Sequence, residues 1–350
     1  GTILDADSIR ITDATLDGTR AAVASDGRDF LVAWSQQDRI ALRRIGSDGR
    51  FLDDTPAFIF TANATPSSPA LAWNGSEYLL AFNNRENGAT SATYTTQIAL
   101  VSAAGGLLEQ PHAINQPLST AVGSDKVWTY SYAGAPLVAS DGRDFLVVYT
   151  RQRNEPPPSS RVTYASAVTS VSAAGAVTAA DVPIVLAAPK ALFWTGTTYV
   201  ALDNANLGYP HGDYGYYGVR INSQGLPLDG PPGGSPESSG PLLPGYYSDF
   251  GVQPLCDATG CYAAGTWAPA IGTLQLFVWR VTDANGTFDR SDPSLVAEMA
   301  AMRRGSSAVA LPGSVGRLLY TRVATEPELL GVSRVFLRTA QPPRTRAVHH

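Results

Sequence analysis

The sequence predicts an all-β protein, a six-bladed β-propeller whose blades are four-stranded antiparallel sheets. The ten residues 23–32 recur letter for letter at 138–147, so the chain contains copies of one unit. Each copy has two short apolar runs separated by a Gly-containing turn, which is the pattern of a β-hairpin. Copies recur at a spacing of roughly fifty residues, which is typical of propeller blades.

The first two strands of each unit are defined by this hairpin. The turn in the first copy is Asp26-Gly27, and glycine accepts a positive φ there without a Cβ clash. The run that follows, 30–34, is too short for a buried helix and is rich in β-branched and aromatic residues, which favours a strand buried on both faces. The other copies of the hairpin lie at 69–82, 138–147, 191–201, 255–264 and 308–320.

A third and a fourth strand complete each unit. In the first unit the third strand, 40–45, leads into a Gly turn that ends at Gly49, and 55–60 supplies the fourth strand. The matching turns contain Gly105, Gly175, Gly225 and Gly286. The predicted blades are 20–62, 66–116, 134–187, 189–232, 250–297 and 306–340.

The two ends of the chain suggest how the ring closes. The sixth copy supplies only three strands, whereas residues 1–12 have the pattern that follows a Gly turn plus a fourth strand. We therefore expect 1–12 to complete the last blade and to remove exposed sheet edges. The result is a single domain over 1–340, followed by a tail, 341–350, that ends in a probable tag remnant. A seventh blade within 114–133 is the competing interpretation.

Composition excludes several classes of function. The net charge is −5 and the only lysines are Lys126 and Lys190, so no basic stripe for nucleic acid is present. No apolar stretch approaches the roughly 18–20 residues of a membrane helix. A signal peptide is absent, but a mature secreted protein would have lost one. We expect a monomer with no cofactor and no metal, and the preference for arginine over lysine resembles high-GC bacterial coding.

The two cysteines predict a disulfide. Cys256 and Cys261 flank the turn of the fifth hairpin, and opposed residues on antiparallel strands bring Cβ atoms within disulfide reach. Such a bond indicates an oxidising compartment, hence a secreted or cell-surface protein. Two free thiols are the alternative, and a zinc site is incomplete without a second Cys/His pair.

Unequal loops locate the expected functional face. Connections between second and third strands emerge on one face of a propeller together with the links between blades. They are long in the second, third and fourth blades, at 83–94, 151–161 and 203–217, and long links add 115–134 and 234–250. Long loops on a rigid repeat are more often functional than structural.

These loops contain aromatic rings interleaved with polar and charged residues. Flat rings stack on the C–H face of a sugar, while carboxylates and guanidinium groups bond its hydroxyls. A glycan is therefore the expected ligand. A surface protein partner would suit the same residues, and packing of the rings onto the propeller is the structural alternative. The expected contacts are Trp128, Tyr130, Arg151, Arg153, Tyr209, His211, Asp213, Tyr216 and Tyr246.

A polysaccharide hydrolase or lyase is the enzymatic alternative. His211, Asp213 and Glu155 are its candidate proton-transfer groups. His112 lies in a fourth strand, where a half-buried structural role is expected. The chain shows no phosphate-binding Gly loop, no nucleophile elbow and no Cys/His metal signature, so no motif names a reaction.

One segment and the repeated pattern each resemble known proteins. The segment 25–34 resembles the Asp-box of sialidase-like propellers, but the spacing differs and it lies between the first and second strands. The repeated A-x-S/W-D/N-G-x-x-F/Y-L-V-x-W pattern, with third strands ending in Asp-Gly turns, looks like the secreted repeat proteins of myxobacteria and related bacteria. That resemblance covers nearly the whole chain and implies a propeller, but it carries over no activity and no functional residue.

Overall fold

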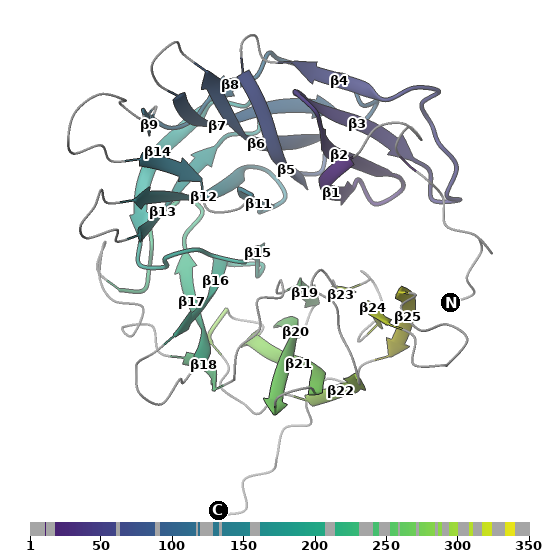
Figure 1. Cartoon of the computed structure of the whole chain (residues 1–350), viewed down its shortest axis with the longest axis vertical. Coiled ribbons are helices and arrows are strands. Elements are labelled where there is room, and N and C mark those ends of the chain that lie inside the picture. Colours follow the sequence, from purple (N-terminus) through teal and green to yellow (C-terminus); the bar gives the residue numbers. More distant parts are fainter. Residues whose placement is uncertain are drawn as a thin grey trace, which may run out of the picture.

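The described part of the chain consists of β-strands arranged in successive sheets around a common centre (Figure 1). The computed structural model describes residues 11, 18–60, 64–87, 92–116, 118–119, 129–132, 135–154, 162–206, 214–230, 241–244, 253–257, 260–270, 273–283, 286–288, 294–299, 308–310, 317–323 and 333–339. Within these ranges no helix is long and apolar enough to cross a bilayer.

The first two sheets pair neighbouring strands in chain order, all antiparallel. Blade 1 consists of β1 (Gly18–Ser25), β2 (Phe30–Gln36), β3 (Arg39–Ile45) and β4 (Ala57–Phe60). Blade 2 consists of β5 (Ala64–Trp73), β6 (Glu77–Asn87), β7 (Ala92–Ser102) and β8 (His112–Ala113), with the short β9 (Leu118–Ser119) also paired to β7.

The next two sheets follow the same order. Blade 3 consists of β11 (Leu137–Ser140), β12 (Phe145–Asn154), β13 (Val162–Val171) and β14 (Val177–Ile184), and β10 (Thr129–Tyr132) pairs with the far half of β12. Blade 4 consists of β15 (Ala191–Trp194), β16 (Tyr199–Asn206), β17 (Tyr214–Ile221) and β18 (Pro241–Pro244).

The C-terminal strands form two further sheets. Blade 5 consists of β19 (Gln253–Asp257), β20 (Gly260–Ala270), β21 (Thr273–Asp283) and β22 (Ser294–Met299). The last sheet consists of β23 (Ala308–Ala310), β24 (Arg317–Val323) and β25 (Ser333–Thr339). Six complete four-stranded blades are therefore not present in the described residues, because this last sheet has three strands. Of the segment 1–12, predicted to complete it, Ile11 alone lies within the described ranges.

The contacts between sheets establish the propeller. The first strand of each sheet contacts the first strand of the next, in the order β1, β5, β11, β15, β19 and β23. Up-and-down sheets whose first strands meet in this way stack face to face around an axis. The fold is thus an all-β propeller with four-stranded antiparallel blades, as the repeat predicts.

The core lies between consecutive blades. Leu31 of β2 and Leu80 of β6 belong to one buried cluster between blades 1 and 2. The next residue along, Ala81, belongs to another cluster with Phe145 and Val147 of blade 3. Side chains alternate between the faces of a strand, so a strand that lies between two blades must be apolar at every position. This explains the continuous apolar runs in the sequence.

The repeated decapeptide builds a self-contained hairpin. The Asp26 carboxylate accepts hydrogen bonds from the backbone N–H groups of Arg28, at 2.8 Å, and Asp29, at 2.6 Å. The Ser25 hydroxyl donates to the Asp29 carbonyl at 2.9 Å. Short polar side chains bonding the backbone two or three residues on are the usual way of closing a tight turn. The second copy, at 138–147, repeats all of these bonds.

The Gly turns after the third strands join neighbouring blades. Gly105 of blade 2 has a φ of +80°, and a Cβ there would lie 3.2 Å from the Arg44 side chain of blade 1. At Gly225 of blade 4 a Cβ would lie 2.2 Å from the Ser170 hydroxyl of blade 3. Glycine serves both the turn and the close approach between blades.

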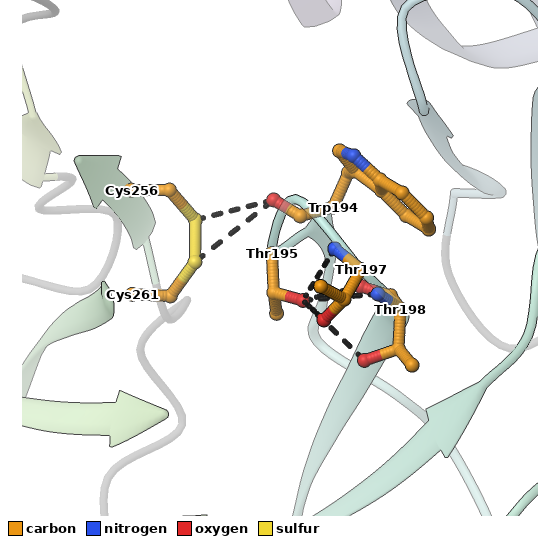
Figure 2. The surroundings of a disulfide bond; sticks show 6 residues. All are labelled: Trp194, Thr195, Thr197, Thr198, Cys256 and Cys261. Carbon is orange, nitrogen blue, oxygen red and sulfur yellow. Dashed lines mark hydrogen bonds between the residues drawn. A yellow bond between two sulfur atoms is a disulfide. The ribbon is translucent and has the colours of Figure 1, made fainter. Parts of the chain in front are cut away.

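The predicted disulfide is confirmed. Cys256 and Cys261 are directly opposed on β19 and β20, with a Cα–Cα distance of 4.0 Å. Figure 2 shows the bridge facing the hairpin of blade 4, with the two sulfur atoms 3.3 and 3.9 Å from the Trp194 carbonyl oxygen. In that hairpin the Thr195 hydroxyl accepts from the Thr198 N–H at 3.1 Å. The bridge therefore belongs to the contact between blades 4 and 5.

Candidate functional site at the loop ends of blades 1 to 3

The segments predicted as long loops in blades 2 and 3 begin as strand, and in blade 2 the segment also ends as strand. In blade 2, β6 continues to Asn87 and β7 begins at Ala92, so the prediction that 83–94 is a loop is wrong at both ends. In blade 3, β12 continues to Asn154 and β13 begins at Val162. These segments are polar and have no alternation of apolar and polar residues. The sequence pattern therefore does not indicate the strands that their backbones form. The central strands thus extend towards the loop face with further strands paired to them, β5 and β9 in blade 2 and β10 in blade 3. We call the extended part of blade 3 its ribbon.

The ribbon of blade 3 brings together three of the predicted contact residues. The strand β10 pairs with the far half of β12, which places Tyr130 opposite Arg153 and Tyr132 opposite Arg151. A fourth predicted contact, Tyr216, lies in β17 of blade 4, opposite Asn204. The remaining predicted site residues lie outside the described ranges, and their roles stay predictions: Trp128, Glu155, Tyr209, His211, Asp213 and Tyr246.

Arg151 lies at the base of this ribbon and is paired within the fold. Its guanidinium forms an ion pair with Asp181 of β14, and the Tyr149 hydroxyl donates to the same carboxylate oxygen. Burial and the Asp181 hydrogen bond both raise the pKa of Tyr149. The other Asp181 oxygen accepts from the Gln116 N–H at 3.4 Å. With both side chains 26% exposed, the pair links the ribbon to blade 2 and leaves Arg151 partly open to solvent.

Buried polar side chains gather where the central strands approach this face. The apolar run of β2 ends in Ser35 and Gln36, and that of β6 ends in Asn83 and Asn84. We call the whole set the polar belt, and it consists of Ser35, Gln36, Ser68, Asn83, Asn84, Thr95, Thr96, Gln97, Thr150, Ser166 and Asp203.

In blades 1 and 3 side chains of the polar belt have hydrogen-bond partners, and Ser35 has its partner in blade 2. Trp34 Nε1 donates to Gln36 Oε1 at 3.0 Å, and the Ser35 hydroxyl accepts from the backbone N–H of Ser68 at 2.9 Å. In blade 3 the hydroxyls of Thr150 and Ser166 lie 2.8 Å apart. The polar groups of these side chains are therefore satisfied by hydrogen bonds within the fold.

Blade 2 differs, because several of its belt oxygens have no hydrogen-bond partner among the described residues. These are Asn84 Oδ1, Thr95 Oγ1, Thr96 Oγ1 and Gln97 Oε1. The residues are only 1%, 5%, 0% and 7% exposed, in that order. A buried polar atom without a partner costs about 1–3 kcal/mol, so native proteins keep few of them. Asn84 lies in a segment predicted as a loop, so the strand register is what reveals these residues as buried.

The opposite end of blades 1 and 2 contains a cavity, and the charged residue that borders it has a partner. A cavity of about 290 Å³ lies there, lined by Leu31 and Leu42 of blade 1, the Asp53 carboxylate and the Gly105 turn of blade 2. Arg44 donates to both Asp53 oxygens, at 2.6 and 2.7 Å. Burial raises the pKa of Asp53, but the hydrogen bonds and charge of Arg44 hold it below its ordinary value. The charge that borders this cavity is therefore already paired.

The described side chains include no group of three or more His, Cys, Asp or Glu placed to hold a metal ion.

No family model and no curated protein matches the chain. Among solved structures it is similar to the ectodomain of the parainfluenza virus 5 hemagglutinin-neuraminidase, with a TM-score of 0.49 and 11% identity over 94% of this chain and 83% of that one. A GH43_1 enzyme from Xanthomonas citri complexed with xylose gives 0.42 and 8%, over 93% and 88%. The Dos1 propeller gives 0.41 and 11%, over 93% and 67%.

Proposed function

We propose that the protein binds glycans through the loop face of blades 2 to 4. The observation that carries this proposal is the set of buried, unpartnered oxygens in blade 2, which lies next along the ring from the ribbon of blade 3. Neutral amide and hydroxyl groups match the hydroxyls of a sugar, which both donate and accept hydrogen bonds. Small polar groups in a shaped setting are also what fixes the orientation of a bound small molecule.

The ribbon of blade 3 supplies the second part of the proposed site. The backbone register puts Tyr130 opposite Arg153. An aromatic ring beside a guanidinium suits a sugar, because the ring stacks on C–H groups while the guanidinium bonds hydroxyls. Trp128, Tyr209 and Tyr246 are proposed to extend this surface.

We also propose that the propeller has six blades and that the N-terminal segment completes the last one. Ile11 packs against Val32 and Trp34, on the face of blade 1 that points away from blade 2. Its carbonyl accepts from Arg43 at 3.3 Å. This position of Ile11 supports an N-terminal segment that joins the last sheet to blade 1 and so covers an exposed edge and face.

A location outside the cytoplasm is part of the same proposal. Disulfides persist in oxidising compartments and are rare among cytosolic proteins. The Cys256–Cys261 bridge supports secretion or display at the cell surface.

Affinity electrophoresis or pull-down on a panel of insoluble and soluble polysaccharides tests the binding proposal. We expect retention of the wild type on at least one polymer, and loss of retention in Trp128→Ala and Tyr209→Ala with unchanged melting curves. Arg28→Ala is the matched control, because its side chain is 88% exposed and lies in a hairpin at the other end of the blade. A wild type that no polymer retains would refute glycan binding.

A further inference from the structure

The unpartnered oxygens of blade 2 divide between its two faces. Leu80 and Phe82 of β6 belong to the cluster shared with blade 1, and Asn84 continues that alternation on the same face. Thr95 is directly opposite Asn84 on β7, and Gln97 is the next residue on that face. Asn84, Thr95 and Gln97 therefore lie between blades 1 and 2, and we call them the acceptor cluster.

Thr96 lies on the other face of the same strand. Its neighbour two positions along, Ile98, belongs to the cluster shared with blade 3. Thr95 and Thr96 are both buried, and both hydroxyls lack a partner among the described residues. The two adjacent threonines thus differ in the pair of blades that they face.

The acceptor cluster calls for a ligand that donates hydrogen bonds. Two of its three atoms are amide oxygens, which only accept, and the third is a hydroxyl. Glu86 lies two residues further along β6 on the same face, exposed at the rim, and accepts from Asn84 Nδ2 at 3.4 Å. A carboxylate at the exposed rim disfavours a second anion, because the two negative charges repel each other.

Arg20 is a cation of blade 1, and it is held on the side of the blades that faces the propeller axis. Arg20 of β1 donates from Nη1 to the Ser68 hydroxyl at 2.6 Å, at the bulge of β5. The strands β1 and β5 are the innermost of their blades, whereas the acceptor cluster lies on β6 and β7. Arg20 is therefore on the axis side of the cluster, whereas Glu86 lies at the exposed rim.

We infer that the acceptor cluster selects a sugar without an acidic group, whose hydroxyls donate to Asn84 Oδ1 and Gln97 Oε1 and bond the Thr95 hydroxyl. This inference rests on the proposed glycan binding and names its ligand class. Asn84 and Glu86 are two residues apart on β6, which corresponds to about 7 Å along the strand. A sugar unit that reaches the cluster would therefore pass Glu86 and enter between blades 1 and 2. Uronic, sialic and sulfated sugars are disfavoured by repulsion from the Glu86 charge.

The test compares neutral polymers (starch, cellulose and mannan) with acidic ones (alginate and heparin), using the full chain. We expect the wild type to be retained by a neutral polymer and not by the acidic ones. Thr95→Val keeps the side-chain shape and removes the hydroxyl, so binding should weaken by about tenfold, the factor for one lost hydrogen bond. Gln97→Leu should weaken it at least as much. Thr96→Val is the matched control and should bind as the wild type does.

The outcomes distinguish a failure of the acceptor cluster from a failure of glycan binding itself. Retention by acidic polymers alone, or equal weakening by Thr95→Val and Thr96→Val, would overturn the acceptor cluster while leaving glycan binding intact. Retention by none of the polymers would remove the proposed function and this inference together. Melting curves of the valine variants separate a binding defect from misfolding, because removing an unpartnered buried hydroxyl should not destabilise the fold.

Glu86→Gln separates charge exclusion from hydrogen bonding. Glu86 is exposed, so the variant should fold as the wild type does. Retention on the neutral polymer should stay, and retention on alginate or heparin should rise, most clearly at low ionic strength. If the variant still fails to bind acidic polymers, the Glu86 charge is not what excludes them.

Discussion

The two copies of the decapeptide share every residue and differ in what covers them. The Ser–Asp hydrogen bond across the turn is 2.9 Å in 23–32 and 2.8 Å in 138–147, so the hairpins are the same locally. Phe30 of the first copy is nevertheless 41% exposed, whereas Phe145 of the second is 1% exposed. Phe145 packs against blade 2, which precedes it in the ring. Local sequence therefore determines the turn, and the neighbouring blade determines the burial.

The largest predicted effect follows from this comparison. Phe145→Ala removes a fully buried ring between blades 2 and 3 and should lower the free energy of unfolding by about 3–5 kcal/mol. If the last blade closes on blade 1, as proposed, Phe30→Ala should cost a similar amount. Urea unfolding of both variants measures the two losses side by side. A loss near zero for Phe30→Ala would show that nothing covers this face of blade 1.

A second prediction concerns a hairpin in which a covalent bond is added. Copies 23–32 and 138–147 close their turns with an aspartate, whereas the hairpin of blade 5 carries the Cys256–Cys261 bridge. Replacing both cysteines by serine should lower the free energy of unfolding by about 2 kcal/mol, the value for so short a closed loop. Thermal unfolding with and without reductant checks it, since reductant should shift the wild type only. Equal sensitivity of the double variant would contradict this assignment.

The smallest effect is a pH dependence in the first hairpin. The Asp29 N–H is the main reason why the pKa of Asp26 lies below its ordinary value. A depressed folded-state pKa stabilises the fold above the unfolded value of about 3.9, and this contribution is lost as the pH falls through the folded value. Asp26→Asn keeps the accepting oxygen, as Asn74 does naturally in blade 2. Its unfolding free energy should therefore fall less steeply below about pH 4 than that of the wild type. Identical slopes would contradict the linkage.

The repeat made most of the scaffold predictable from sequence. The Asp-Gly hairpins, the doubly buried second strands and the opposed cysteines all follow from local patterns that recur, and each is present. The polar extensions of β6 and β12 were not predictable, because Asn84 or Arg151 in a strand has no apolar neighbour pattern to reveal it. Their pairing depends on strands distant in sequence, as with Tyr130 and Arg153.

The acceptor cluster was missed for a related reason. Asn84, Thr95 and Gln97 look like ordinary loop residues until the register places them on one face between two blades. A polar residue in a predicted apolar strand is the signal to look for in such repeats. The copied parts build the propeller, and the parts that depart from the copy carry the proposed site.

The most direct test of this division is hydrogen–deuterium exchange of the wild type, free and saturated with fragments of a neutral polysaccharide that retains it. We predict added protection of backbone amides in 83–97 and none in 23–32 or 138–147. Protection confined to the two decapeptide hairpins would contradict the account, because it would place the ligand on the scaffold.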